Sequence, residues 1–142
     1  RMGISVDSSA ASANANFFNE MRALLWAHKA RGTQVRLTPR RLVELATIDG
    51  ARALSLAERT GSLTPGKQAD IILVRMDDLD IAPVVDPFNS LVYSAQPDNV
   101  DTVIVDGRVL RRDGKFVSID TDEIIRDATR SAQRLRKAAG LA

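Results

Sequence analysis

Asp7 is the residue whose type and position best suit chemistry. It follows residues 3–6, a short alternating segment that predicts a strand, and it precedes a loop of Ser, Ala and Asn. Barrel enzymes place catalytic groups where a strand ends and a loop begins. A carboxylate at such a point can bind a divalent metal or take a proton from water. A short Asp side chain also commonly caps a turn, so the residues alone allow a catalytic or a structural role for Asp7.

Two polar residues of the loop after Asp7, Ser8 and Asn14, are placed to contact a substrate if Asp7 is catalytic. A solvated loop without function is an equal alternative for them. His28 is the only histidine. We expect it within a helix, several turns past the loop, and therefore as a surface or packing residue rather than a metal ligand.

The composition limits which sites this chain can build. One histidine and no cysteine cannot complete a site of several imidazoles, a zinc ribbon or a disulfide. The net charge of the 142 residues is only +2, so we expect no nucleic-acid partner. No apolar run approaches the roughly 20 residues of a membrane span, and the lack of cysteine fits a cytoplasmic location. Because Arg1 precedes Met2, we also expect a fragment of a longer polypeptide.

The first part of the sequence has helical patterns. Apolar residues at three- and four-residue steps predict a helix over residues 17–30. Thr38 followed by Pro39 is typical of an N-cap and the first helical position, and it predicts the start of a second helix. Residues 47–61 predict a third helix, with Thr47 as its cap.

The second part changes to strand patterns and ends in a helix. Residues 69–74, ADIILV, form a continuous apolar run that predicts a strand buried on both faces. The pairs Asp106-Gly107 and Asp113-Gly114 lie between strand formers and predict two tight hairpin turns, hence a three-stranded meander. Asp120 is expected to cap a final amphipathic helix that ends near Gly140.

Residues 50–74, GARALSLAERTGSLTPGKQADIILV, resemble the C-terminal signature of the amidohydrolase superfamily. The resemblance is closest to the branch of cytosine and guanine deaminases and triazine hydrolases. In that branch a Gly-Ala-x-x-Leu helix leads to Gly-Ser-Leu-x-x-Gly-Lys-x-Ala-Asp and a hydrophobic strand. Residues 98–117 are similar to the strand meander near the family's end, and residues 4–22 to the end of its last barrel strand. The resemblance therefore covers almost the whole chain.

The resemblance implies an α/β fold that is the C-terminal part of a (β/α)8 TIM-type barrel, with a small accessory β-sandwich and a terminal helix. Residues 1–60 would supply the last barrel strand and the helices after it. Residues 61–142 would supply sandwich strands and the C-terminal helix. The Gly61–Lys67 run is not a phosphate-binding loop, because Gln68 stands where that motif needs Ser or Thr.

The resemblance also implies a metal-dependent hydrolase that cleaves a non-peptide C–N bond, or a related leaving group, on a nitrogen-containing ring. Asp7 would be both the metal ligand and the catalytic proton carrier, with Ser8 and Asn14 as substrate contacts. The metal would be zinc or, alternatively, iron. The family's His-x-His and its other metal histidines are absent here, so we expect the isolated chain to be inactive and to bind no metal tightly.

Two alternatives remain at this point. The chain could be a non-catalytic assembly module of β-sandwich and helices, which would tolerate the loss of Asp7. It could also belong to the cyclic amidase branch, with enzymes similar to dihydroorotase and hydantoinase, since the signature after Gly61 is shared widely. In every case we expect a homo-oligomer, because the barrel-facing surface would be apolar.

Overall fold

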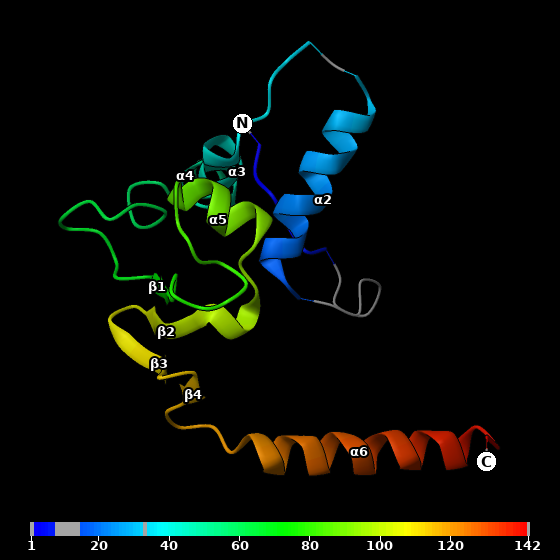
Figure 1. Ribbon diagram of the computed structural model, residues 1–142. Helices are drawn as coiled ribbons and strands as arrows, with labels where there is room; N and C mark the ends of the chain where they lie inside the picture. The colour runs from blue at the N-terminus through cyan, green and yellow to red at the C-terminus, as the bar shows by residue number, and fades with distance from the viewer. Residues whose placement is uncertain (1, 8–14, 33, 142) are drawn as a thin grey trace.

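The computed structural model describes residues 2–7, 15–32 and 34–141 (Figure 1). The fold is mixed α/β, with an antiparallel sheet in the order β1-β2-β3-β4. Helices α2 to α5 lie to one side of this sheet, and α6 extends away from its far end (Figure 1). The elements are α2 (Phe17–Ala30), α3 (Pro39–Ala46), α4 (Ile48–Ala53), β1 (Ile71–Val74), α5 (Pro87–Tyr93), the 3-10 helix η1 (Pro97–Asn99), β2 (Val100–Val105), β3 (Arg108–Arg112), β4 (Lys115–Phe116) and α6 (Thr121–Ala138).

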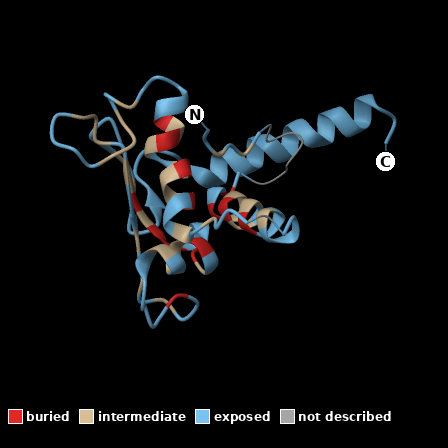
Figure 2. Cartoon of the chain, turned by 90° about the horizontal axis from the view of Figure 1, so that it is seen from above, coloured by how far each residue is buried: buried red, intermediate tan, exposed pale blue. Residues whose placement is uncertain are grey.

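The hydrophobic core lies where α2, α3 and α5 meet the start of β2. Leu25 of α2 and Leu42 of α3 are fully buried against Val92 of α5, and Val100 joins them from the sheet. Figure 2 shows the buried residues gathered in this region and α6 exposed along its whole length. Within the described ranges, no helix is both long and apolar enough to span a membrane.

The helix starts depend on polar side chains that satisfy unpaired backbone N–H groups. Thr38 caps α3 as predicted, because its hydroxyl accepts from the N–H of Arg41 at 3.2 Å and Pro39 opens the helix. Thr47 occupies the N-cap position of α4 as predicted, but its side chain accepts no hydrogen bond from that helix. Its hydroxyl instead donates to the carbonyl of Val43 at 2.7 Å, one turn back in the preceding helix. The helix after Thr47 is also shorter than predicted and ends at Ala53.

One predicted strand is absent, and a second is present but shorter and more exposed than predicted. Residues 2–7 form no strand, and the N–H of Ile4 donates to the carbonyl of Leu45 at the end of α3. The continuous apolar run gives only the four-residue β1, and Ile72 and Leu73 are each 52% exposed. The reason is that β1 pairs with β2 along one edge, and no second layer covers these two side chains within the described residues.

The meander from β2 to β4 confirms the hairpin prediction. Asp106 and Gly107 have φ angles of 49° and 75°, and Asp113 and Gly114 have 50° and 72°. Positive φ at both central residues is what a two-residue type I′ turn requires, and Asp and Gly accept it more readily than other residues. The turns set the pairing next to each hairpin, and a bulge then shifts the β2–β3 register between Ile104 and Val103.

Asp70 joins three separate segments at the start of β1. Its carboxylate accepts from the N–H of Asp106 in the first hairpin turn at 2.8 Å and from the Thr60 hydroxyl at 2.8 Å. The backbone hydrogen bond from Asp106 is the main cause that lowers the pKa of Asp70, with Thr60 second. Lys67 makes its hydrogen bond elsewhere, to the carbonyl of Ala57. Asp70 therefore has a structural role.

We expect Asp70→Ala to lower the midpoint of thermal unfolding at pH 7 and to reduce the loss of stability in acid. A carboxyl group whose pKa is lowered by folding stabilises the folded state in full at pH values above its unfolded-state pKa. This contribution to the free energy of unfolding is lost as the pH falls through the folded-state pKa. Circular dichroism melts between pH 7 and about pH 3 would measure both effects. Asp77→Ala, at an exposed carboxylate after β1, is the control. Equal melting of the two variants would contradict the role of Asp70.

Candidate functional site

Asp7 is positioned by a short segment that lies against α3 and α4. The Ile4 N–H donates to the Leu45 carbonyl at 3.3 Å, and the Ile4 side chain packs against the core. A Cβ on Gly3 would stand 2.8 Å from the Cα of Gly50, so this close approach of two backbones requires glycine. The segment is therefore held in place three residues before Asp7.

The backbone of Asp7 has a φ angle of 57°, in the left-handed region. Asp and Asn enter this region several times more often than other non-glycine residues. The Asp7 N–H donates to the Ser5 hydroxyl at 3.2 Å, and the residue is exposed. The carboxylate is thus presented to solvent at the end of an anchored segment. Ser8 and Asn14, the predicted substrate contacts, lie outside the described residues.

The described residues do not form a metal site by themselves. They contain no group of three or more His, Cys, Asp or Glu side chains that could hold an ion. His28 lies near the end of α2, and its Nε2 contacts the Val35 carbonyl. A catalytic zinc site has three protein ligands and one open position. Asp7 could be one such ligand, and the others would have to come from outside the described part of this chain.

Asp49 is the most buried carboxylate in the helical layer, and its neighbours give it a structural role. It is 8% exposed and forms ion pairs with Arg52 at 2.7 Å and with Arg41. The hydrogen bond from Arg52 is the main cause that lowers the pKa of Asp49. These two ion pairs tie α3, which carries Arg41, to α4, which carries Asp49 and Arg52. Asp49 is not poised for proton transfer.

Arg22 is a structural residue that the sequence analysis did not identify. Its guanidinium donates to the carbonyls of Tyr93 at 3.5 Å and Ala95 at 2.9 Å, where α5 ends. Burial lowers the pKa of Arg22. Recognising α5 from Asp86 and Pro87 would have indicated that its last carbonyls need a donor.

A groove of about 610 Å³ runs between the end of α3, α4 and the start of β1. Its lining is mostly apolar, with Ile4, Leu54, Leu63 and Ile72 among its walls, and Asp70 is its one carboxylate among the described residues. Asp70 is already engaged by Asp106 and Thr60. The groove is therefore suited to packing against apolar chain and not to acid–base chemistry.

Comparison with protein families matches residues 1–110 to the amidohydrolase family. The chain is 40% identical over 136 residues to a 5-methylthioadenosine/S-adenosylhomocysteine deaminase of Desulforudis audaxviator, covering 95% of this chain and 32% of that protein. It is 36% identical over 135 residues to a 5'-deoxyadenosine deaminase of Methanosphaera stadtmanae, covering 94% of this chain and 31% of that protein. The chain thus spans about a third of the length of these relatives.

Two solved structures have a similar fold. An adenosine deaminase from Xanthomonas campestris with bound zinc superposes with a TM-score of 0.89 at 28% identity, over 95% of this chain and 31% of that one. An atrazine chlorohydrolase from Arthrobacter aurescens, in complex with zinc, superposes with a TM-score of 0.77 at 30% identity, over 86% of this chain and 27% of that one. Zinc is therefore bound by both structural relatives.

Proposed function

Because this chain belongs to the amidohydrolase family, we propose that it is the C-terminal part of a metal-dependent deaminase that acts on an aminopurine nucleoside. The observation that carries this proposal is the match over almost the whole chain to nucleoside deaminases at 36–40% identity. The triazine-type relative matches a smaller share of the chain, which favours deamination over removal of chloride. The reaction class is hydrolysis of the bond between a ring carbon and its exocyclic amino nitrogen, in which water supplies the new oxygen and ammonia is released.

We also propose how the chain is divided. Residues 1–60 would contribute the last strand of a (β/α)8 barrel and the helices after it, and residues 61–142 strands of an accessory β-sandwich with the C-terminal helix. The antiparallel sheet, whose strands all lie within residues 71–116, supports the sandwich part of this division. The core crosses the division, because α5 of the second part packs with α2 and α3 of the first. The exposed Ile72 and Leu73 of β1 would then be covered by other parts of the protein.

In this proposal Asp7 is the one site carboxylate that the described chain contributes. Its exposure and its place at the end of an anchored segment support the role. A zinc ion held mainly by histidines elsewhere in the protein would supply a water of lowered pKa. The carboxylate of Asp7 would take up a proton at one of its oxygens and release it to the departing amine. Ser8 and Asn14 would contact the substrate.

A chimera tests the proposal. In the Desulforudis audaxviator relative, the C-terminal segment that this chain matches would be replaced by this chain. We expect the zinc-loaded chimera to release ammonia from 5-methylthioadenosine, measured with a coupled ammonia assay. The isolated 142 residues should release none and should retain no zinc after dialysis. A folded, zinc-loaded chimera without deaminase activity, or an isolated chain with turnover, would refute the proposal.

A further inference from the structure

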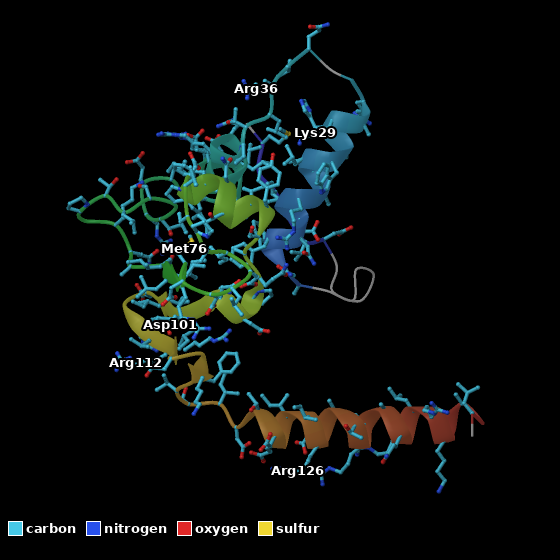
Figure 3. All side chains as sticks on the ribbon, in the orientation of Figure 1. Lys29, Arg36, Met76, Asp101, Arg112 and Arg126 are labelled. Carbon is cyan, nitrogen blue, oxygen red and sulfur yellow. The ribbon has the colours of Figure 1, made fainter. Side chains whose placement is uncertain are left out.

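Gly3 contacts the backbone of Gly50 more closely than a residue with a side chain would allow. A Cβ on Gly3 would stand 2.8 Å from the Cα of Gly50. The φ angle of Gly3 is not positive, so the conformation of residue 3 does not itself call for glycine. Figures 1 and 3 show the segment of residues 2–7, in dark blue, beginning beside α3 and α4. Glycine is therefore needed at position 3 for the closeness of this contact.

The backbone opposite Gly3 supports the N-terminal segment. Gly50 lies inside α4, although glycine is disfavoured in a helix interior. A Cβ on Gly50 would stand 3.2 Å from the carbonyl oxygen of Leu45, and this oxygen accepts from the N–H of Ile4. The two glycines therefore leave room beside a carbonyl to which the segment is hydrogen-bonded. We call Gly50 and the Leu45 carbonyl the support of residues 2–7.

The support is held in place because α4 is fixed by its neighbours. Asp49 of α4 forms ion pairs with Arg41 of α3 and with Arg52. A second glycine, Gly61, approaches α4 so closely that a Cβ on it would stand 2.7 Å from the Cβ of Ala51. The N-terminal segment, in contrast, forms no strand. Crowding of the contact therefore moves this segment rather than α4.

We propose that Gly3 is a positioning residue, which sets the place of the Asp7 carboxylate through its contact with the support. Two carbon atoms pack best at about 3.5–4.0 Å, so an alanine at position 3 would move the segment by roughly 1 Å. The Ser5 hydroxyl accepts from the Asp7 N–H, which ties Asp7 to the segment that moves. A misplacement of about 1 Å is enough to lower a reaction rate about 10²-fold.

This inference rests on the proposed role of Asp7, and it extends that role to the signature of residues 50–74. Gly50 of the signature belongs to the support, and Ala51 and Gly61 pack closely where α4 is held. The signature therefore does more than connect the helices to the sheet, because it holds the segment that carries the site carboxylate. Both sides of the contact lie within the described residues, so the contact does not depend on what else covers this chain.

Cobalt substitution of the chimera tests the positioning role. The visible absorption of bound Co²⁺ depends on the geometry of its ligands, so it reports a displaced carboxylate without a measurement of activity. We expect Gly3→Ala to change this spectrum. In the zinc-loaded chimera we expect the same variant to lower kcat for 5-methylthioadenosine about 10²-fold and to change KM less. A substitution that only lowers stability leaves the spectrum and the kcat of the folded, metal-loaded molecules unchanged.

Gly66→Ala is the matched control, because position 66 has open space for a Cβ but a φ of 92°. Alanine there strains the turn before β1 without crowding the support, so we expect a lower melting temperature with an unchanged spectrum and kcat. Gly50→Ala serves if Gly3→Ala does not fold. It gives α4 a better helix former but crowds the Leu45 carbonyl, and we expect a smaller loss of kcat than the one predicted for Gly3→Ala.

Asp7→Asn separates this inference from the proposed function. A changed cobalt spectrum and a lowered kcat in both Asp7→Asn and Gly3→Ala would support the two proposals together. If Asp7→Asn has these effects while Gly3→Ala and Gly50→Ala behave as Gly66→Ala does, the positioning role of Gly3 is overturned and the proposed function stands. If Asp7→Asn changes neither the spectrum nor kcat, the proposed role of Asp7 fails, and the positioning role of Gly3 fails with it.

Discussion

Asp7→Asn is expected to lower the deamination rate of the zinc-loaded chimera by about 10²- to 10⁴-fold, the usual contribution of a positioned acid–base group. Asparagine has nearly the same size as aspartate, and it adopts positive φ angles such as the 57° of Asp7 as readily as aspartate does. The substitution therefore removes the negative charge and the proton acceptor without forcing the backbone to change. Steady-state ammonia release would measure the loss.

The control for Asp7→Asn is Asp77→Asn, which makes the same chemical change at an exposed residue in the loop after β1. We expect this variant to keep the activity of the unmodified chimera. If Asp7→Asn also kept full activity, Asp7 would be a turn residue only. The assembly-module interpretation of this part of the chain would then take precedence over the catalytic one.

Leu42→Ala is expected to destabilise the fold by about 2–5 kcal/mol, since it removes a fully buried side chain and leaves a cavity. Leu42 packs at the junction of α2, α3 and α5, where neighbouring side chains cannot collapse into the space without moving a helix. Domains are commonly stable by only about 5–15 kcal/mol, so the loss is a large fraction of the total.

Urea unfolding monitored by circular dichroism would measure the effect of Leu42→Ala. The matched control is Leu79→Ala, the same substitution at a side chain that is 102% exposed. We expect Leu79→Ala to stay within about 0.5 kcal/mol of the unmodified chain. Equal unfolding midpoints for the two variants would contradict the position of the core.

The features that the sequence predicted well depend on neighbouring residues. Thr38 and Pro39 start α3 because a cap needs only the next few N–H groups. Asp120 caps α6 for the same reason, with its carboxylate accepting from the Glu123 N–H at 3.0 Å. The two Asp-Gly turns succeed because positive φ is a property of those residues themselves. In each case, residues close together in the sequence were enough to predict the feature.

The errors have both local and distant causes. Thr47 stands at the N-cap position of α4, but its hydroxyl donates to the Val43 carbonyl one turn back and accepts from no N–H of α4. The structural role of Asp70 has a distant cause, because its partner Asp106 comes from the first hairpin turn, 36 residues later in the chain. The sequence analysis did not predict α5, although its start has a local signal. Asp86 accepts from the Asn89 N–H as the N-cap, and Pro87 occupies the first turn. The short length of α5 gives little apolar periodicity.

The candidate site could be predicted only in part. The sequence gives the type of Asp7 and its place before a polar loop, and the structure shows the anchored segment that leads to it. The sequence cannot identify the other ligands of a metal site, because it contains only one histidine and no cysteine. Similarity to relatives whose structures contain zinc supplies this context, because ligands distant in sequence come together only in the folded protein.

The most direct test of the account is a crystal structure of the zinc-loaded chimera, with the metal located by its anomalous scattering. The account predicts zinc within about 2.0–2.2 Å of a carboxylate oxygen of Asp7, the usual zinc–carboxylate distance, with histidines of the relative as the other ligands. A fully coordinated zinc with the Asp7 carboxylate directed to solvent would contradict it.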